Sequence, residues 1–76
     1  KKNSLYETVI VSANDTLVEL FLKKKIKFID IHKYLFKFIN SKKFLFYKNI
    51  YPKNIKDIIK LNDYVRLNII KKVYKS

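Results

Sequence analysis

Ser12-Ala13-Asn14-Asp15 opens the stretch that decides the fold, which continues through Phe21-Leu22 to Lys25-Ile26-Lys27-Phe28-Ile29-Asp30-Ile31. Apolar residues recur at helical spacings from just before this stretch through its first part: Ile10, Ala13, Leu17, Leu20 and Phe21. The lysines that follow are typical of a helix C-terminus, because cations there interact favourably with the helix dipole. We therefore predict a helix from about Thr8 to Lys23, a tight basic connector and the capped start of a second helix.

The start of the first helix has alternatives. The β-branched run Val9-Ile10-Val11 is equally compatible with a short strand. Ser12 or Asn14 would instead cap a helix that begins later, with Asp15 favourably placed in its first turn.

A second amphipathic helix is expected from about Ile31 to Asn40. Asp30 precedes it as a candidate N-cap. Its apolar residues follow the i, i+4, i+7, i+8 pattern of one helix face: Ile31, Leu35, Phe38 and Ile39. Asn40-Ser41 is expected to mark its end.

The region from Phe44 to Lys53 is predicted to be an extended loop held in place by its aromatic residues. The run Phe44-Leu45-Phe46-Tyr47 resembles a strand, but the chain offers no second strand to pair with it. Pro52 excludes a helix there and biases Tyr51 towards an extended conformation.

A third helix is predicted from about Ile55 to Tyr74, capped by Asn54. The residues that keep its period are Ile55, Ile58, Ile59, Asn62, Val65, Arg66, Ile69 and Val73. Three such helices predict an all-α fold, a small open bundle in which some apolar stripes stay uncovered. An uncovered apolar face implies a missing fourth element or a partner.

Composition points to an anionic partner but gives a simpler explanation as well. The chain has 76 residues and a formal charge of +12, with 18 Lys and Arg residues of which only Arg66 is Arg. Abundant Lys, Ile, Asn, Phe and Tyr also share A/T-rich codons, so base composition alone can raise the lysine content. A nucleic-acid binder usually enriches Arg for bidentate contacts. Nucleic acid is therefore a possible but less favoured partner, and no membrane association is expected.

The chain offers little catalytic chemistry. It has neither Cys nor Gly, which excludes thiolate sites and a Gly-rich phosphate loop. His32 has no second His or Cys to complete a metal site, so a solvent-facing role is favoured. Asp15 and Glu19 lie four residues apart on one helix, which favours a solvated face over a shared metal. We assign no catalytic, cofactor-binding or metal-binding residue to this sequence.

Two segments resemble the C-terminal helical domain of 1-deoxy-D-xylulose 5-phosphate reductoisomerase. One runs from Tyr6 to Asp15 and continues with Phe21-Leu22 and Lys25-Ile26-Lys27-Phe28-Ile29-Asp30-Ile31. The other runs from Asn54 to Ile59 and continues with Asn62 and Val65-Arg66, which matches the spacing of that family's last helix. The sequence departs from the family pattern at Glu7, Val11, Asp15 and Asn62.

The resemblance implies that residues 1–76 form one C-terminal helical-bundle domain, with the first bundle helix missing from this sequence. The implied parent enzyme uses NADPH and a divalent metal (Mg²⁺ or Mn²⁺) to rearrange and reduce a sugar phosphate in non-mevalonate isoprenoid biosynthesis. None of those ligands is expected in this chain, whose implied partner is the catalytic domain of the same protein. The parent is expected to be a homodimer. Four residues are expected in structural or interdomain contacts: Asn14, Asp15, Asp30 and Arg66.

Two alternatives remain at this stage. One is a stand-alone basic helical module that binds RNA or associates with the ribosome, and the other is a helical protein-interaction module. The resemblance suggests the cytoplasm of an A/T-rich bacterium as the compartment, with a plastid-like organelle of a parasite as the alternative.

Overall fold

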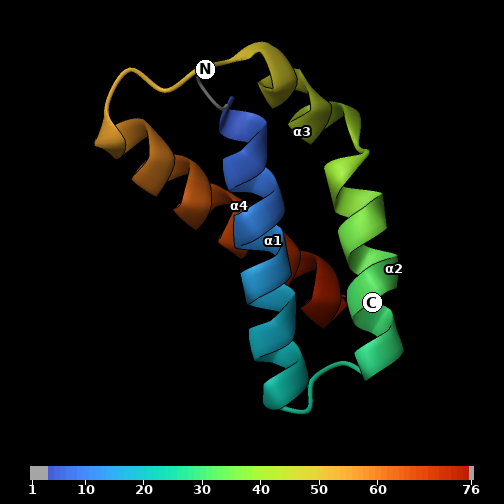
Figure 1. The fold of residues 1–76 in the computed structure, drawn as a ribbon. Helices are drawn as coiled ribbons and strands as arrows, with labels where there is room; N and C mark the ends of the chain where they lie inside the picture. Colours follow the sequence, from blue (N-terminus) through green and yellow to red (C-terminus); the bar gives the residue numbers. More distant parts are fainter. Residues whose placement is uncertain (1–3, 76) are drawn as a thin grey trace.

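A computed structural model describes residues 4–75, which contain helices and turns and no strand. The elements are α1 (Leu5–Leu22), α2 (Phe28–Ile39), α3 (Lys42–Leu45), a 3₁₀ turn η1 (Phe46–Asn49) and α4 (Ile55–Lys75). Figure 1 shows α2 beside α1 and α4 crossing behind α1, with α3 and η1 at the end where α1 begins. The predicted all-α bundle is confirmed.

Helix α1 begins earlier than the sequence suggested. Ser4 is its N-cap, and the Ser4 side chain accepts a hydrogen bond from the Tyr6 N–H at 3.3 Å. The strand alternative for Val9-Ile10-Val11 is wrong, because Val9 lies in the core of a continuous helix. Ser12 and Asn14 are not caps either, since both lie in the middle of α1.

The connector after α1 is a tight turn made without glycine. The Lys25 N–H donates to the Leu20 carbonyl and the Lys24 N–H donates to the Phe21 carbonyl, each at 2.9 Å. This pair of bonds is the Schellman arrangement, which places one residue in the left-handed region. That residue is Lys24, with φ of 61°, at a position where glycine is preferred.

Asp30 caps α2 from inside the helix rather than from its N-cap position, which corrects the prediction. The helix starts at Phe28, and Lys27 is its N-cap. The Asp30 carboxylate reaches back to accept the Lys27 N–H at 2.9 Å. An acid three residues into a helix satisfies one otherwise unpaired donor and favours the positive end of the dipole. The predicted end at Asn40-Ser41 is confirmed, since α2 ends at Ile39.

The predicted loop over residues 44–53 is wrong for its first half, which is helical. The Ser41 carbonyl accepts the Phe44 and Leu45 N–H groups at 3.1 and 2.9 Å, which starts the short helix α3. Phe44 is almost fully buried, with its ring centroid 6.1 Å from Phe38 and 6.2 Å from Tyr64. Burial of this ring decides the local structure, and only the residues from Ile50 to Asn54 remain a connector.

Helix α4 closes the core and confirms the predicted third helix. The Asn54 side chain accepts the Asp57 N–H at 3.2 Å, as expected of a cap. The buried residues of α4 are spaced four apart: Leu61, Val65, Ile69 and Val73. They pack against the inner face of α1, which contributes Leu5, Val9, Ala13, Leu17 and Leu20. Leu61 was not predicted, whereas the predicted stripe residues Ile55, Ile58 and Ile59 lie outside this core.

Candidate interdomain surface

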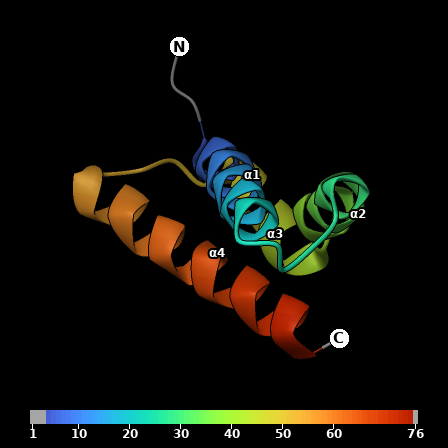
Figure 2. The ribbon, with the colours of Figure 1, turned by 90° about the horizontal axis from the view of Figure 1, so that it is seen from below.

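One side of α1 is left open by the elements within residues 4–75. Figure 2 shows α2 to one side of α1 and α4 below it, with no helix on the remaining side. Exposed residues recur on that side at helical spacing: Glu7, Val11, Asn14, Asp15, Val18 and Leu22. Val11 is 58% exposed and Leu22 is 72% exposed. Helix α1 is therefore apolar on its inner face and carries apolar side chains on its outer face as well, which is typical of a contact surface.

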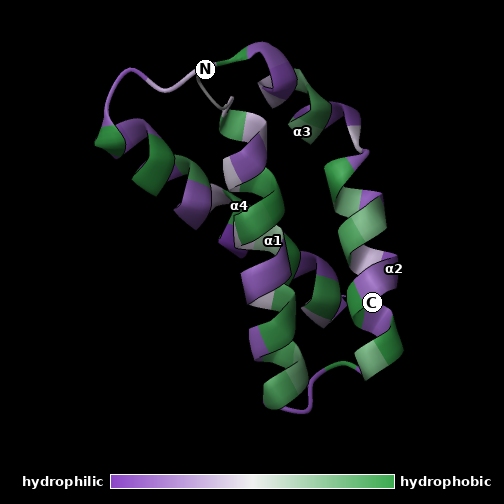
Figure 3. Ribbon diagram, viewed as in Figure 1, coloured by the Kyte–Doolittle hydropathy of each residue, from purple (hydrophilic) through white to green (hydrophobic). Residues whose placement is uncertain are grey.

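A groove separates this side of α1 from the first turns of α4. It has a volume of about 520 Å³, and its apolar lining includes Val11, Pro52, Ile58 and Ile59. Ile59 is 55% exposed. Figure 3 shows hydrophobic residues in the first turns of α4, where α4 has diverged from α1. Covering this groove would be favourable by about 25 cal/mol for each Å² of apolar surface removed from water.

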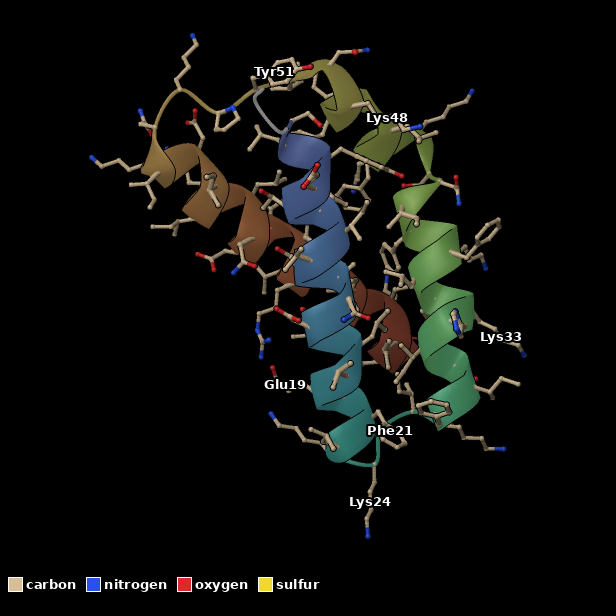
Figure 4. The ribbon with its side chains drawn as sticks, in the orientation of Figure 1. Glu19, Phe21, Lys24, Lys33, Lys48 and Tyr51 are labelled. Carbon is tan, nitrogen blue, oxygen red and sulfur yellow. The ribbon has the colours of Figure 1, made fainter. Side chains whose placement is uncertain are left out.

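Polar contacts join α1 to α4 along the edge of this surface. The Ser12 hydroxyl donates to the Asn62 side-chain carbonyl. Further along, the two terminal nitrogens of Arg66 donate to the two carboxylate oxygens of Glu19, at 2.6 and 2.7 Å. Figure 4 shows Glu19 on the side of α1 that faces away from α2. We call these two contacts the α1/α4 seam.

The seam has a fixed charge state at neutral pH. Hydrogen bonds from Arg66, and then from Lys23 at 3.0 Å, lower the pKa of Glu19 to about 2. The hydrogen bond to Glu19 in turn raises the pKa of Arg66 above its usual value. A bidentate guanidinium–carboxylate pair favours one distance and one orientation, so it adds to the core contacts that hold α1 and α4 together.

The four residues predicted to make structural or interdomain contacts lie at three different places in the structure. Asn14 and Asp15 lie side by side on the open face of α1 and are exposed. Asp30 is committed to the start of α2, and Arg66 is committed to the seam. Of the four, Asn14 and Asp15 are therefore the ones whose side chains are exposed on the open face of α1.

Glu19 is the residue that sequence reasoning missed. The sequence analysis assigned Glu19, together with Asp15, to a solvated helix face. The four-residue spacing between Glu19 and Lys23 indicates an ion pair along the helix. Its partner on α4 lies 47 residues away, and no local pattern identifies such a contact. Ser12 was likewise considered as a cap, whereas its hydroxyl serves the seam.

His32 is exposed on α2. Residues 4–75 contain no group of three His, Cys, Asp or Glu side chains close enough to hold a metal ion. None of the helices in that range is both long enough and apolar enough to cross a membrane.

Comparison with known proteins agrees with the resemblance found in the sequence. A family model described as DXP reductoisomerase C-terminal domain matches residues 1–68. Over 68 residues, the chain is 54% identical to the 1-deoxy-D-xylulose 5-phosphate reductoisomerase of Pelagibacter ubique (strain HTCC1062). That match covers 90% of this chain and 18% of the relative, so the chain spans less than a fifth of that protein. No solved structure matches the chain. Neither the family model nor the relative supports the alternative of a stand-alone RNA-binding module.

Proposed function

Because this chain belongs to the DXP reductoisomerase C-terminal domain family, we propose that it is the C-terminal structural domain of a 1-deoxy-D-xylulose 5-phosphate reductoisomerase. The match over residues 1–68 carries this proposal. The open apolar face of α1 and the α1/α4 groove support it, because they suit a domain that packs against the rest of a larger protein.

The parent protein, on this proposal, rearranges and reduces its sugar phosphate with NADPH and a divalent metal, as one step of isoprenoid biosynthesis. Its catalytic residues and the ligands of NADPH and Mg²⁺ or Mn²⁺ lie outside this chain. The role of this chain is structural. Its core and the α1/α4 seam keep its surface rigid, and that surface packs against the catalytic domain. A rigid support matters because misplacing a catalytic group by about 1 Å can cost a hundredfold in rate.

The α1/α4 groove is the place for a further bundle helix. Residues 1–76 form one domain in this proposal, and a helix from the rest of the parent protein covers Val11, Ile58 and Ile59. A fourth helix would bury the side chains that the three long helices leave in water. Asn14 and Asp15, exposed on the same side of α1, make the polar contacts at the rim of this interface.

The parent protein is proposed to be a homodimer in the cytoplasm of a bacterium. The bacterial origin of the relative supports the compartment. No described surface of this chain is assigned to the dimer contact.

An activity assay on the full-length protein tests the proposal directly. We expect oxidation of NADPH that requires both 1-deoxy-D-xylulose 5-phosphate and a divalent metal. A folded full-length protein that leaves NADPH unchanged under those conditions would contradict the proposed function.

A matched pair of variants tests the structural role of the groove. Ile59→Lys puts a charge into the groove, whereas Leu67→Lys puts the same charge on α4 outside it, at a similar exposure of 57% against 55%. In the full-length protein, we expect Ile59→Lys to lower the Tm and the active fraction while the KM stays unchanged. Leu67→Lys should resemble the wild type. Equal effects of the two changes, or a loss of kcat at an unchanged Tm, would contradict a structural role for the groove.

A further inference from the structure

A second hollow lies between the C-terminal half of α4 and the helices α2 and α3, and it is strongly basic. Its volume is about 550 Å³, within the range of small-ligand pockets. Five lysines from three helices line it, together with Asn68: Lys37, Lys43, Lys71, Lys72 and Lys75. No acidic residue is among its lining residues. We call it the lysine pocket.

The lysines are not spread evenly over the hollows of this molecule. The α1/α4 groove has a similar volume of about 520 Å³. Its lining residues include the acid Glu7 and no lysine. A third hollow of about 510 Å³ contains Lys53 and Lys60 together with Asp57. The high lysine content of the whole chain does not by itself explain why five lysines surround one hollow without an acid.

One lysine of the pocket is held in a defined position. The Lys43 ammonium donates to the Asn68 side-chain carbonyl at 2.9 Å and lies 5.4 Å from the centre of the Tyr64 ring. Asn68 is itself fixed, because its amide nitrogen donates to the Tyr64 carbonyl at 2.8 Å. A cation held in place loses less conformational entropy when an anion binds than a freely moving one does.

The remaining four lysines have no carboxylate partner among residues 4–75. Two of them, Lys72 and Lys75, lie in the last turn of α4, where they also offset the negative end of the helix dipole. Close like charges repel one another, and a multivalent anion between them removes that repulsion. Phe38 and Phe44 also line the hollow and give it an apolar wall.

We propose that the lysine pocket binds a compact polyphosphate anion, such as inorganic triphosphate or the phosphate chain of a nucleotide. Lysine binds phosphate as a point charge, without the planar fork of arginine, so several lysines around one hollow suit a ligand with several phosphate groups. The pocket is separate from the α1/α4 groove, and this assignment does not depend on the role proposed for that groove.

Two charge-matched double variants of the full-length protein test the assignment. Lys71→Gln with Lys72→Gln removes two charges from the lysine pocket, and Lys53→Gln with Lys60→Gln removes two from the hollow that contains Asp57. Binding of inorganic triphosphate is measured by calorimetry at constant ionic strength, with circular dichroism to confirm that each variant is folded. Phosphate sites elsewhere in the protein are common to all three proteins and cancel in the comparison.

We expect the first double variant to bind triphosphate about tenfold more weakly, since each exposed ion pair contributes modestly. The second should change the affinity less than about twofold. Equal weakening in the two variants would show a general charge effect and would overturn the proposal, as would no weakening in either. ATP in place of triphosphate distinguishes the two sources of the anion. Tighter binding of ATP that is lost in the first variant indicates a nucleotide, and equal affinities indicate the phosphate chain alone.

Discussion

The two halves of α4 carry similar side chains in opposite surroundings. In its first turns, Ile55, Ile58 and Ile59 are exposed to solvent. In its second half, Val65 and Ile69 are completely buried against α1. The sequence pattern is apolar and helical in both halves, so the difference arises from what covers them. The first turns of α4 therefore have the apolar side chains of a core face, but no element within residues 4–75 covers them.

Truncation of Ile69 should have the largest effect. Ile69 is 0% exposed, and Ile69→Ala leaves a cavity in the core that should cost about 3 kcal/mol of unfolding free energy. Urea denaturation measures this cost, both in the 76-residue chain and in the full-length protein. The same cost is expected in both, because the core around Ile69 is complete within this chain. A cost below about 1 kcal/mol would mean that the second half of α4 is not packed as described.

Truncation of Ile59 distinguishes the two contexts and comes next. In the 76-residue chain, Ile59→Ala removes a side chain that is already half in water and should cost less than about 1 kcal/mol. In the full-length protein, a helix over the groove would bury it, and the cost should rise to about 2 kcal/mol. The two unfolding experiments are run under identical conditions. An unchanged cost in the full-length protein would mean that the groove stays open there.

Replacement of Lys24 tests a region that needs no partner. Lys24→Gly should stabilise the fold by about 1 kcal/mol, because glycine adopts the left-handed conformation without the steric cost that lysine meets there. Lys24→Ala is the matched control, since it removes the same charge but keeps the β-carbon. A gain in Tm for both variants would assign the effect to charge instead of backbone conformation.

The acid sensitivity of the seam should be the smallest effect, because Glu19 and Arg66 are only partly buried. The pKa of Glu19 is lowered in the folded state to about 2, so its contribution to stability is fully present above its unfolded pKa. That contribution is lost as the pH falls from the unfolded pKa towards 2. We expect Glu19→Gln to lose less Tm than the wild type between pH 6 and pH 3. Parallel losses in the two proteins would show that ionised Glu19 contributes no measurable stability that acid could remove.

Local patterns predicted the helices well and their contacts poorly. The apolar period placed α1, α2 and α4 along the chain, and Asn54 marked the start of α4 correctly. Asp30 was predicted to be the N-cap of α2, whereas it lies three residues after the N-cap. The sequence does not separate the two positions, because an acid stabilises a helix start at either one. The short helix α3 was missed because burial of Phe44 depends on Tyr64 of α4, which is distant in sequence, and on how α2 places Phe38.

The candidate surface was harder to predict for the same reason. Whether Ile58 and Ile59 face a core or a groove depends on where α4 leaves α1, which no local pattern specifies. Arg66 was predicted to make a structural or interdomain contact, and its partner Glu19 can be identified only once the two helices are packed together. The resemblance to a family carried the prediction of a larger protein, and the contact proposed within that protein is at the open α1/α4 groove.

The seam also bears on the order in which the chain folds. Its two contacts join residues 50 and 47 positions apart, whereas α1 and α2 are joined by a turn of a few residues. Closing a long loop costs more chain entropy than closing a short one, and contacts distant in sequence slow folding. The α1–α2 hairpin should therefore form first and α4 should dock last. Until α4 docks, the part of the inner face of α1 that α4 covers stays exposed, so the newly made domain is most prone to aggregation at that stage.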